Sequence, residues 1–284
     1  MKKGTVLNII LIVLVLAGLS LILYPTVSDR LNARSQSKVI SDYSQTLSAM
    51  EQPDFEKLRQ QAQAYNEGIK ERVNVFRPDE AELEAYQAAL NVDGNGVMGY
   101  VVIPKIKCSM PIYHGTEDST LQVAIGHMEW TSLPVGGESS HCVISGHSGL
   151  PSARLFTDIE KLTLGDSFYL RVLDEELYYQ VDQILVVLPE QTDALRIVEG
   201  EDYCTLVTCT PYGVNSHRLL VRGHRVDGPD TEAPVQQSSP ASAQSPAEDS
   251  APRLWAIGII TAAAMIETMI MIFSRKTRKK EAGK

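Results

Sequence analysis

Cys209, His147 and Arg218 are the side chains whose types and positions could together do chemistry in this chain. Cys209 ends a β-prone run and is followed by Pro211 and Gly213, which stop a strand and open a loop. Arg218 begins the next β-prone run, nine residues further on. A thiol beside a fixed positive charge is ionised more easily, and the thiolate is a nucleophile. The pattern predicts a nucleophilic cysteine on a rigid support.

A cysteine nucleophile also needs a base, and the chain has six histidines. His147 lies at the end of another β-prone run, between Gly146 and Gly149, so it is again placed at a turn after a strand. His217 would face away from the site if its neighbour Arg218 faces toward it, because strand neighbours alternate. The sequence alone does not choose among His147 and the other candidates, which are His114, His127, His141 and His224.

Arg222 is the rival of Arg218 for the role of the cation. It lies four residues later, so the two side chains share one face of a strand, and either could be an ordinary surface residue. A guanidinium near the thiol would donate to a carbonyl oxygen as that oxygen becomes negative. The chain has no cluster with the spacing of a metal site, so we expect neither metal nor cofactor.

These motifs resemble those of the sortases, the cysteine transpeptidases of Gram-positive cell surfaces. TLVTC at 205–209 is followed by Arg218, and SGH stands upstream at 145–147. The flanking text is most similar to class C, the pilin-polymerising sortases: GY at 99–100, PKI at 104–106, PIYHGT at 111–116, TSLPVGG at 131–137 and GLPSARLF at 149–156. The resemblance covers about residues 65 to 225. It implies that Cys209 is the nucleophile, His147 the general acid and base, and Arg218 the stabiliser of oxyanion and substrate.

The resemblance also implies a reaction and its partners. A class C sortase cleaves an LPXTG-like sorting signal and transfers the acyl group to an amine, usually a lysine of a pilin subunit, and so builds pili. Two alternatives remain open on the residues alone. One is a membrane-anchored cysteine peptidase that uses the same pair with water as acceptor. The other is a non-catalytic surface interaction module in which Cys209 is a structural thiol.

The charge of the chain is uneven. Of 284 residues with a formal net charge of −9, basic residues gather at both ends, so the part between them is strongly acidic. Such a surface repels nucleic acid and favours amine-bearing partners. The other cysteines, Cys108, Cys142 and Cys204, form no dense disulfide framework, and we expect them to be small buried side chains.

Two apolar runs predict transmembrane helices at residues 5–24 and 254–273. Lysines precede the first run, and the second is followed by a basic tail at 274–284. Both ends, including residues 1–4, are therefore predicted to be cytoplasmic, with the catalytic domain outside the cell. A cleaved signal peptide is the alternative for the first run. Glu267 is an unusual acidic residue within the second run.

The remaining chain divides by composition into three parts. Residues 25–95 are helical in composition, which fits a solvated spacer or, by resemblance, the lid region of class C sortases. The Asp-Pro-aromatic motif of such lids is replaced here, and Phe76 or Arg77 could fill the cleft instead. Residues 96–227 are the predicted catalytic domain. Residues 228–253 are rich in Pro, Ser, Ala and Gln and are predicted to be a disordered linker.

The catalytic domain is predicted to be mainly β. Its strands are expected at 97–103, 110–113, 141–145, 167–172, 177–188, 203–209 and about 217–226, and its short helices near 120–126 and 152–161. Many short strands closed by Gly and Pro turns favour a barrel or a sandwich. By resemblance this domain is the sortase-type closed β-barrel, preceded by the helical lid region and flanked by the two transmembrane helices.

Overall fold

The computed structural model describes residues 3–70 and 80–228. Several predictions therefore lie outside the described residues: the lid candidates Phe76 and Arg77, nearly all of the linker, the second apolar run with Glu267, and the basic tail.

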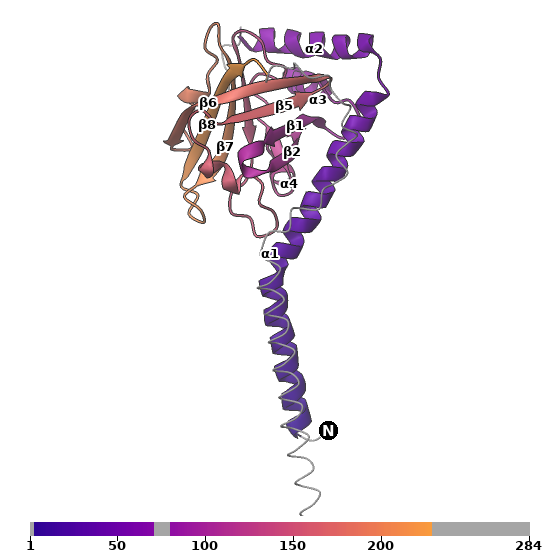
Figure 1. Ribbon diagram of the computed structural model, residues 1–284, viewed down its shortest axis with the longest axis vertical. Coiled ribbons are helices and arrows are strands. Elements are labelled where there is room, and N and C mark those ends of the chain that lie inside the picture. Colours follow the sequence, from indigo (N-terminus) through magenta and orange to yellow (C-terminus); the bar gives the residue numbers. More distant parts are fainter. Residues whose placement is uncertain (1–2, 71–79, 229–284) are drawn as a thin grey trace, which may run out of the picture. The chain divides into compact units, whose positions relative to one another are not determined.

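The strands form one closed barrel in the order β1-β2-β3-β4-β7-β8-β6-β5 (Figure 1). Most neighbours are antiparallel, but β2 with β3 and β4 with β7 are parallel pairs. The parallel β4–β7 pair brings together two segments that lie about sixty residues apart in the sequence. The strands are β1 Val97–Ile103, β2 Cys108–His114, β3 Ile125–His127, β4 Ser140–Ser145, β5 Ser167–Val172, β6 Glu175–Val187, β7 Asp202–Thr210 and β8 His217–Val226.

The predicted mainly-β closed barrel is confirmed, and β1 and β5 have the predicted bounds. The prediction of a helix near 120–126 is wrong beyond Leu121. Helix α4 covers only Asp118–Leu121, and the chain then enters β3, a strand of three residues. Such a short strand shows too little alternation to be recognised from sequence. The expected helix at 152–161 is a 3₁₀ turn, η2, over Thr157–Lys161. The other 3₁₀ turns are η1 (Pro104–Ile106) and η3 (Asp193–Leu195).

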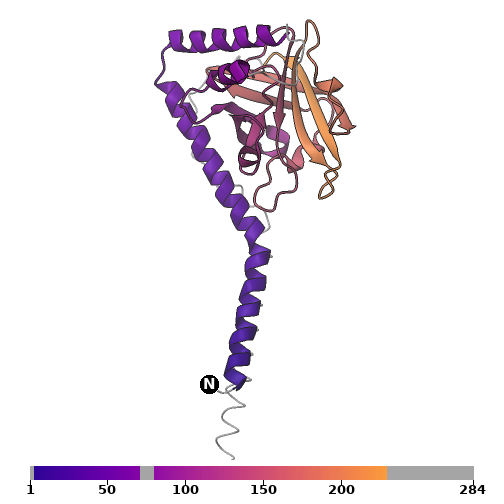
Figure 2. The same cartoon turned by 180° about the vertical axis from the view of Figure 1, so that it is seen from behind.

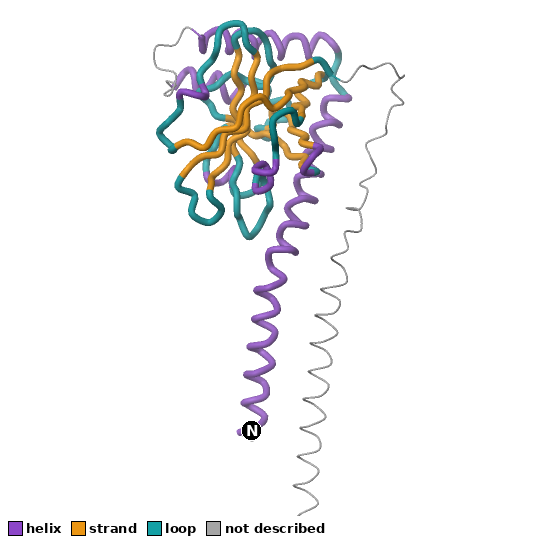
Figure 3. Tube along the Cα trace, turned by 60° about the vertical axis from the view of Figure 1, so that its left-hand side comes forward, coloured by secondary structure: helices purple, strands orange, loops and turns teal. Residues whose placement is uncertain are grey.

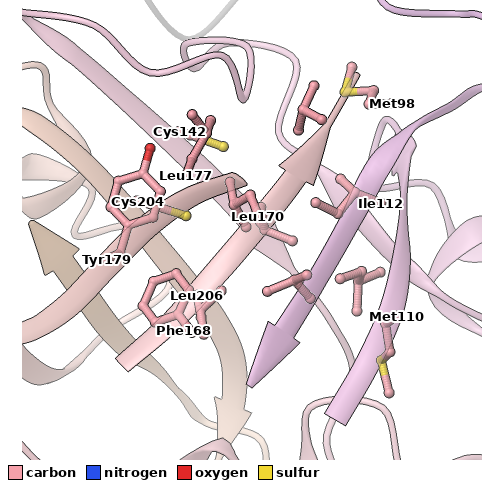
Figure 4. Close-up of a cluster of buried hydrophobic side chains, with 14 of the residues drawn as sticks. Met98, Met110, Ile112, Cys142, Phe168, Leu170, Leu177, Tyr179, Cys204 and Leu206 are labelled. Carbon is pink, nitrogen blue, oxygen red and sulfur yellow. The ribbon is translucent and has the colours of Figure 1, made fainter. Parts of the chain in front are cut away.

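The core fills the barrel with side chains that alternate inward along each strand. On β5, for example, Phe168, Leu170 and Val172 are buried, while the residues between them are partly exposed. Figure 4 shows side chains of several strands meeting in the barrel interior, with Phe168 stacked on Tyr179. This packing holds the strands, and therefore the strand ends, in fixed positions.

Helix α1 runs without a break from Lys3 to Ser48 and includes Pro25. It is long enough and, in its first part, apolar enough to cross a membrane. The helix does not end where the predicted membrane span ends, and its second part lies along the barrel (Figure 2). There the buried Tyr43 hydroxyl donates to Met98 O at 2.9 Å and accepts from Leu173 N at 3.0 Å. One continuous helix thus contains the apolar segment and also packs against the catalytic domain.

Helices α2 (Gln52–Lys70) and α3 (Glu80–Ala88) pack against the barrel (Figure 3). Phe55 and Ala62 of α2 and Tyr86 of α3 are buried members of the main core. Asn66 also exchanges two hydrogen bonds with the backbone of Leu133, at 2.7 and 3.2 Å. These helices are therefore part of the folded domain, and the interpretation of this region as a solvated spacer is wrong for them.

Candidate active site

The strand register brings the predicted nucleophile and cation together. Strand β7 lies between β4 and β8, and Cys209 of β7 is directly paired with Arg218 of β8. Directly opposed residues of neighbouring strands point to the same face of a sheet. Both side chains are half-buried, so they are held by the barrel and still open to solvent. The juxtaposition expected from the spacing of these two residues is therefore present.

His147 reaches the same level from the other side of β7. Strand β4 is paired with β7 up to Ser145 and Val207. The pairing then continues for one more residue, because Gly146 N donates to Val207 O at 3.0 Å and Thr208 Oγ1 donates to Gly146 O at 2.7 Å. Continuing the register places His147 level with Cys209. No hydrogen bond joins the two side chains among the described residues, which is common in the absence of substrate.

Residue 146 has room for glycine only, and this packing fixes the position of the backbone just before His147. A Cβ at residue 146 would lie 2.8 Å from both Ile125 Cγ2 and Phe156 Cδ2, closer than real Cβ contacts. Phe156 in turn donates its backbone N–H to His147 O at 3.1 Å. The glycine that precedes the histidine is therefore required by core packing, and the loop after the histidine is closed back onto it.

Arg218 is oriented by the loop between β7 and β8. Its Nη1 donates to Asn215 O at 3.2 Å and to His217 O at 3.1 Å. Within the described part of the chain, no carboxylate forms an ion pair with this guanidinium. Its positive charge is therefore not neutralised locally and is available to a carbonyl oxygen bound next to Cys209.

Arg222, the rival cation, has a structural role instead. It forms a two-pronged ion pair with Asp182, at 3.0 Å from Nε and 2.7 Å from Nη2. Its guanidinium also lies 4.0 Å from the centre of the Tyr203 ring. The hydrogen bonds to Asp182 raise the pKa of Arg222 above its ordinary value. Since these partners occupy the guanidinium, the geometry favours Arg218 as the functional cation.

The two arginines form a matched pair of variants. We expect Arg218→Lys to lower kcat by about 10²-fold or more, because lysine cannot reproduce the planar fork of donors, while Tm stays nearly unchanged. We expect Arg222→Lys to keep kcat within about twofold but to lower the free energy of unfolding by about 1–2 kcal/mol, because the paired and stacked guanidinium is lost. Peptide turnover and thermal unfolding of both variants measure this. The reverse pattern would assign the functional role to Arg222.

The other buried histidines are engaged in the fold. His127 is fully buried, with Nδ1 3.0 Å from the Tyr86 hydroxyl and Nε2 2.8 Å from Ser132 O. His141 has Nδ1 2.9 Å from Arg196 O and Nε2 2.7 Å from Thr205 Oγ1, and burial lowers its pKa to about 4.

His114 is likewise placed between Gly96 O and Ala89 O, and burial lowers its pKa from its ordinary value. His217 pairs with Thr210 on the β7–β8 ladder, one residue out of step with Cys209. His224 lies inside β8, opposite Tyr203 and far along the strand from Cys209. His147 is therefore the histidine whose position on the ladder suits it to act on Cys209.

A buried apolar cluster continues from the site along the same face of the sheet. Val207 and Leu220 are paired with each other and lie two residues from Cys209 and Arg218, so all four share this face. With Val143 and Leu195 they form a second hydrophobic cluster, separate from the barrel core, to which further partly buried side chains are added: Met128, Trp130, Leu185, Val187 and Ala194. The sequence analysis missed this cluster, because its members come from segments far apart in the chain.

Tyr212 is a second feature that the sequence analysis did not identify. It lies in the loop between Cys209 and Arg218, is 65% exposed, and its ring lies against Gly149, where an added Cβ would be 3.0 Å from Cε2. Gly149 follows His147 and has φ +79°, a conformation that suits glycine. The loops that follow the nucleophile and the histidine thus touch each other beside the site. The Pro211-Tyr212-Gly213 sequence, a turn that carries an aromatic residue, could have identified Tyr212 from the sequence.

The residues that the structure describes contain no group of three His, Cys, Asp or Glu side chains that could hold a metal ion. A half-buried cysteine paired with an arginine at one end of a closed barrel, with a histidine just beyond the neighbouring strand, suits cysteine-dependent acyl transfer.

Comparisons with known proteins agree with this class. A family profile for the sortase domain matches residues 101–226. The crystal structure of sortase C1 from Streptococcus agalactiae is 47% identical with a TM-score of 0.65, covering 68% of this chain and all of that one. The structure of Clostridium perfringens sortase C with the C-terminal cell wall sorting motif is 41% identical with a TM-score of 0.59, covering 67% of this chain and 99% of that one. Sortase A of Bacillus anthracis is 25% identical over 80% of this chain and 97% of its own length.

The chain belongs to the sortase family of cysteine transpeptidases. Its structural neighbours include class C sortases, as the flanking motifs indicated.

Proposed function

We propose that this chain is a membrane-anchored class C sortase that joins pilin subunits. The observation that carries the proposal is the arrangement of three side chains. Cys209 of β7 is paired with Arg218 of β8, and His147 follows β4 at the level that continues the pairing of β4 with β7. The similarity to class C structures supports the pilin-type substrate, and the sorting motif bound by the Clostridium perfringens enzyme supports an LPXTG-like signal.

In the first half of the proposed reaction, the Cys209 thiolate attacks the threonine carbonyl carbon of the sorting signal. Arg218 donates hydrogen bonds to the carbonyl oxygen while it carries negative charge. The carbon–nitrogen bond then breaks, and His147 as imidazolium gives its proton to the leaving amine. The product is a thioester between Cys209 and the threonine.

In the second half, an amine attacks the thioester carbonyl carbon. Neutral His147 takes a proton from that amine, the carbon–sulfur bond breaks, and the Cys209 thiolate is restored. For a class C enzyme the acceptor is a pilin lysine. The acidic chain, with a formal net charge of −9, favours the approach of a cationic acceptor at long range.

The apolar cluster beside the site suits the apolar part of the signal. An extended peptide whose carbonyl reaches Cys209 would place its apolar side chains against the partly buried members of this cluster, of which Val187 is paired with Arg218. Burial of one leucine side chain there contributes about 1.5–3 kcal/mol to binding. This arrangement would select a peptide with apolar residues just before the cleaved bond.

The proposed topology has helix α1 as an uncleaved anchor, the catalytic domain outside the cell, and residues 254–273 as a second span that returns the basic tail to the cytoplasm. Helix α1 supports the first anchor by its length and composition. Its hydrogen bonds to the barrel, such as Gln36 Nε2 to Val123 O at 2.8 Å, would hold the domain close to the membrane surface.

The test is a transfer assay on the full-length chain in detergent micelles. A fluorescent LPXTG-type peptide is supplied with increasing amounts of a lysine peptide, and products are separated by mass. We expect a covalent thioacyl-enzyme and an amide-linked product, whose share rises with the lysine peptide at the expense of the hydrolysed peptide. Hydrolysis alone at saturating amine would establish a peptidase. No consumption of this peptide or of pilin sorting peptides would contradict the proposed substrate.

A further inference from the structure

The barrel interior contains a pair of cysteines that the proposed reaction does not use. Cys142 of β4 and Cys204 of β7 are directly paired on the parallel ladder. They are 3% and 0% exposed, and both belong to the main core. Figure 4 shows them beside Leu177 and Tyr179, which line the same part of the interior.

The spacing of the pair suits a covalent bond. Paired strands lie about 4.7–4.9 Å apart, and disulfides join Cα atoms that are about 4.4–6.8 Å apart. The two side chains lie on the same face of the sheet, because directly opposed residues of neighbouring strands point the same way. The strand pairing therefore already brings the two residues to a separation that a disulfide can span.

The pair is separated from the nucleophile. Cys204 and Cys209 lie on the same strand but five residues apart, so they point to opposite faces of the sheet. Cys108, the remaining cysteine, lies on β2, which is separated from β4 by β3. A bond between Cys142 and Cys204 would leave Cys209 free to react.

We propose that Cys142 and Cys204 form a disulfide when the chain folds in an oxidising compartment, and that this bond ties β4 to β7. The oxidant belongs to the class of disulfide-bearing thiol oxidants, such as a thiol–disulfide oxidoreductase or oxidised glutathione. That the compartment lies outside the membrane rests on the proposed function, whereas the bond itself does not.

The bond forms by two exchanges. The Cys142 thiolate attacks one sulfur of the oxidant, whose disulfide breaks and releases a thiol. Cys204 then loses its proton and attacks the Cys142 sulfur, which expels the second thiol of the oxidant. Two protein thiols are thereby oxidised, and one disulfide of the oxidant is reduced to two thiols.

The two thiols are enclosed by the core once the barrel has formed. Because neither side chain is accessible in the closed barrel, the exchange takes place before β4 and β7 have closed, and the finished bond is shielded from reductants.

The proposed disulfide would also affect the candidate active site. The bond would join the strands five residues before Cys209 and five before His147, so the two reactive residues would stay level even when the barrel opens locally. A cross-link between residues 142 and 204 also closes a long loop in the unfolded chain, which stabilises the folded state.

The test uses the full-length chain with Cys209→Ala, so that the nucleophile does not react. The chain is unfolded, refolded in detergent with a glutathione redox buffer, and alkylated in denaturant without reductant. We expect only Cys108 to be alkylated, and a digest to yield the peptides of Cys142 and Cys204 joined together. Alkylation of all three cysteines, or a bond that includes Cys108, would overturn the proposal.

Two redox forms of the same chain then test what the bond does, without relying on a variant that may not fold. We expect the oxidised form to have a Tm about 5–15 °C above that of the reduced form. We also expect a phosphine to reduce it rapidly in denaturant but slowly in the native state. Equal Tm values for the two forms would contradict the proposed role of the disulfide in stabilising the pairing of β4 with β7. In the chain with Cys209 intact, the transfer assay reports on the proposed function separately, since both forms should turn over within about twofold at ordinary temperature.

Discussion

Replacing Cys209 with alanine removes the thioacyl-enzyme and lowers transpeptidation by at least about 10⁴-fold, which corresponds to about 5.5 kcal/mol of transition-state stabilisation. The reason is that the thioester forms on the Cys209 sulfur, and alanine has no atom that can replace it. Intact mass measured after mixing with a sorting-signal peptide reports the intermediate, and product formation reports turnover. The fold should be unaffected, because Cys209 is half-buried at the end of β7 and outside the hydrophobic core.

Cys108→Ala is the matched control. Cys108 is only 8% exposed, and its burial raises the pKa to about 12, so its thiol is neither accessible nor ionised at neutral pH. We expect this variant to form the thioacyl-enzyme at the normal rate and to lose only a little stability. An adduct that persists in Cys209→Ala and disappears in Cys108→Ala would contradict the assignment of the nucleophile. Full activity in both variants would show that neither cysteine is the nucleophile.

The fold was predictable where the sequence repeats a simple physical pattern. Strand β5 alternates buried and partly exposed side chains along its length, and β1 does so in its second half. Gly96 and Pro104 flank β1, and Asp166 precedes β5, so these ends could be placed. Strand β3 could not, because three residues give no period, and what makes them a strand is pairing with β2 and β4. The closure of the barrel depends on such long-range pairs.

Helix α2 shows how tertiary contacts override local signals. Asn66 and Gly68 both have low helix propensity, yet the helix continues to Lys70. Asn66 is only 5% exposed and bonds to both backbone groups of Leu133, so the barrel satisfies its amide. Those bonds are made with a segment more than sixty residues away, which local propensity cannot represent.

The candidate site was predictable in its residue types but not in its arrangement. The sequence could place Cys209 and Arg218 at the two ends of one loop, and the β7–β8 register agrees. It could not choose among the histidines, because that choice depends on the β4–β7 pairing across about sixty residues. The pairing also explains why Gly146 precedes the histidine, since Ile125 and Phe156 leave no room for a side chain there.

Replacing His147 with asparagine lowers transpeptidation by about 10²–10⁴-fold, because the leaving amine is no longer protonated and the incoming amine is no longer deprotonated. The matched control is His217→Asn, which changes the same chemistry at a residue adjacent to Arg218. His217 bonds through Nδ1 to Ser216 Oγ at 2.9 Å and is paired with Thr210. We expect that variant to keep activity within about threefold.

The pH dependence of the two variants separates a catalytic role from a structural one. Loss of an acid and base should remove one limb of the pH profile of kcat/KM in His147→Asn, whereas a merely displaced loop would lower the whole profile and leave its shape unchanged. The profile of His217→Asn should match that of the original chain. If His217→Asn instead removed that limb of the pH profile of kcat/KM, His217 would be the base. The parallel pairing of β4 with β7 would then no longer explain the site.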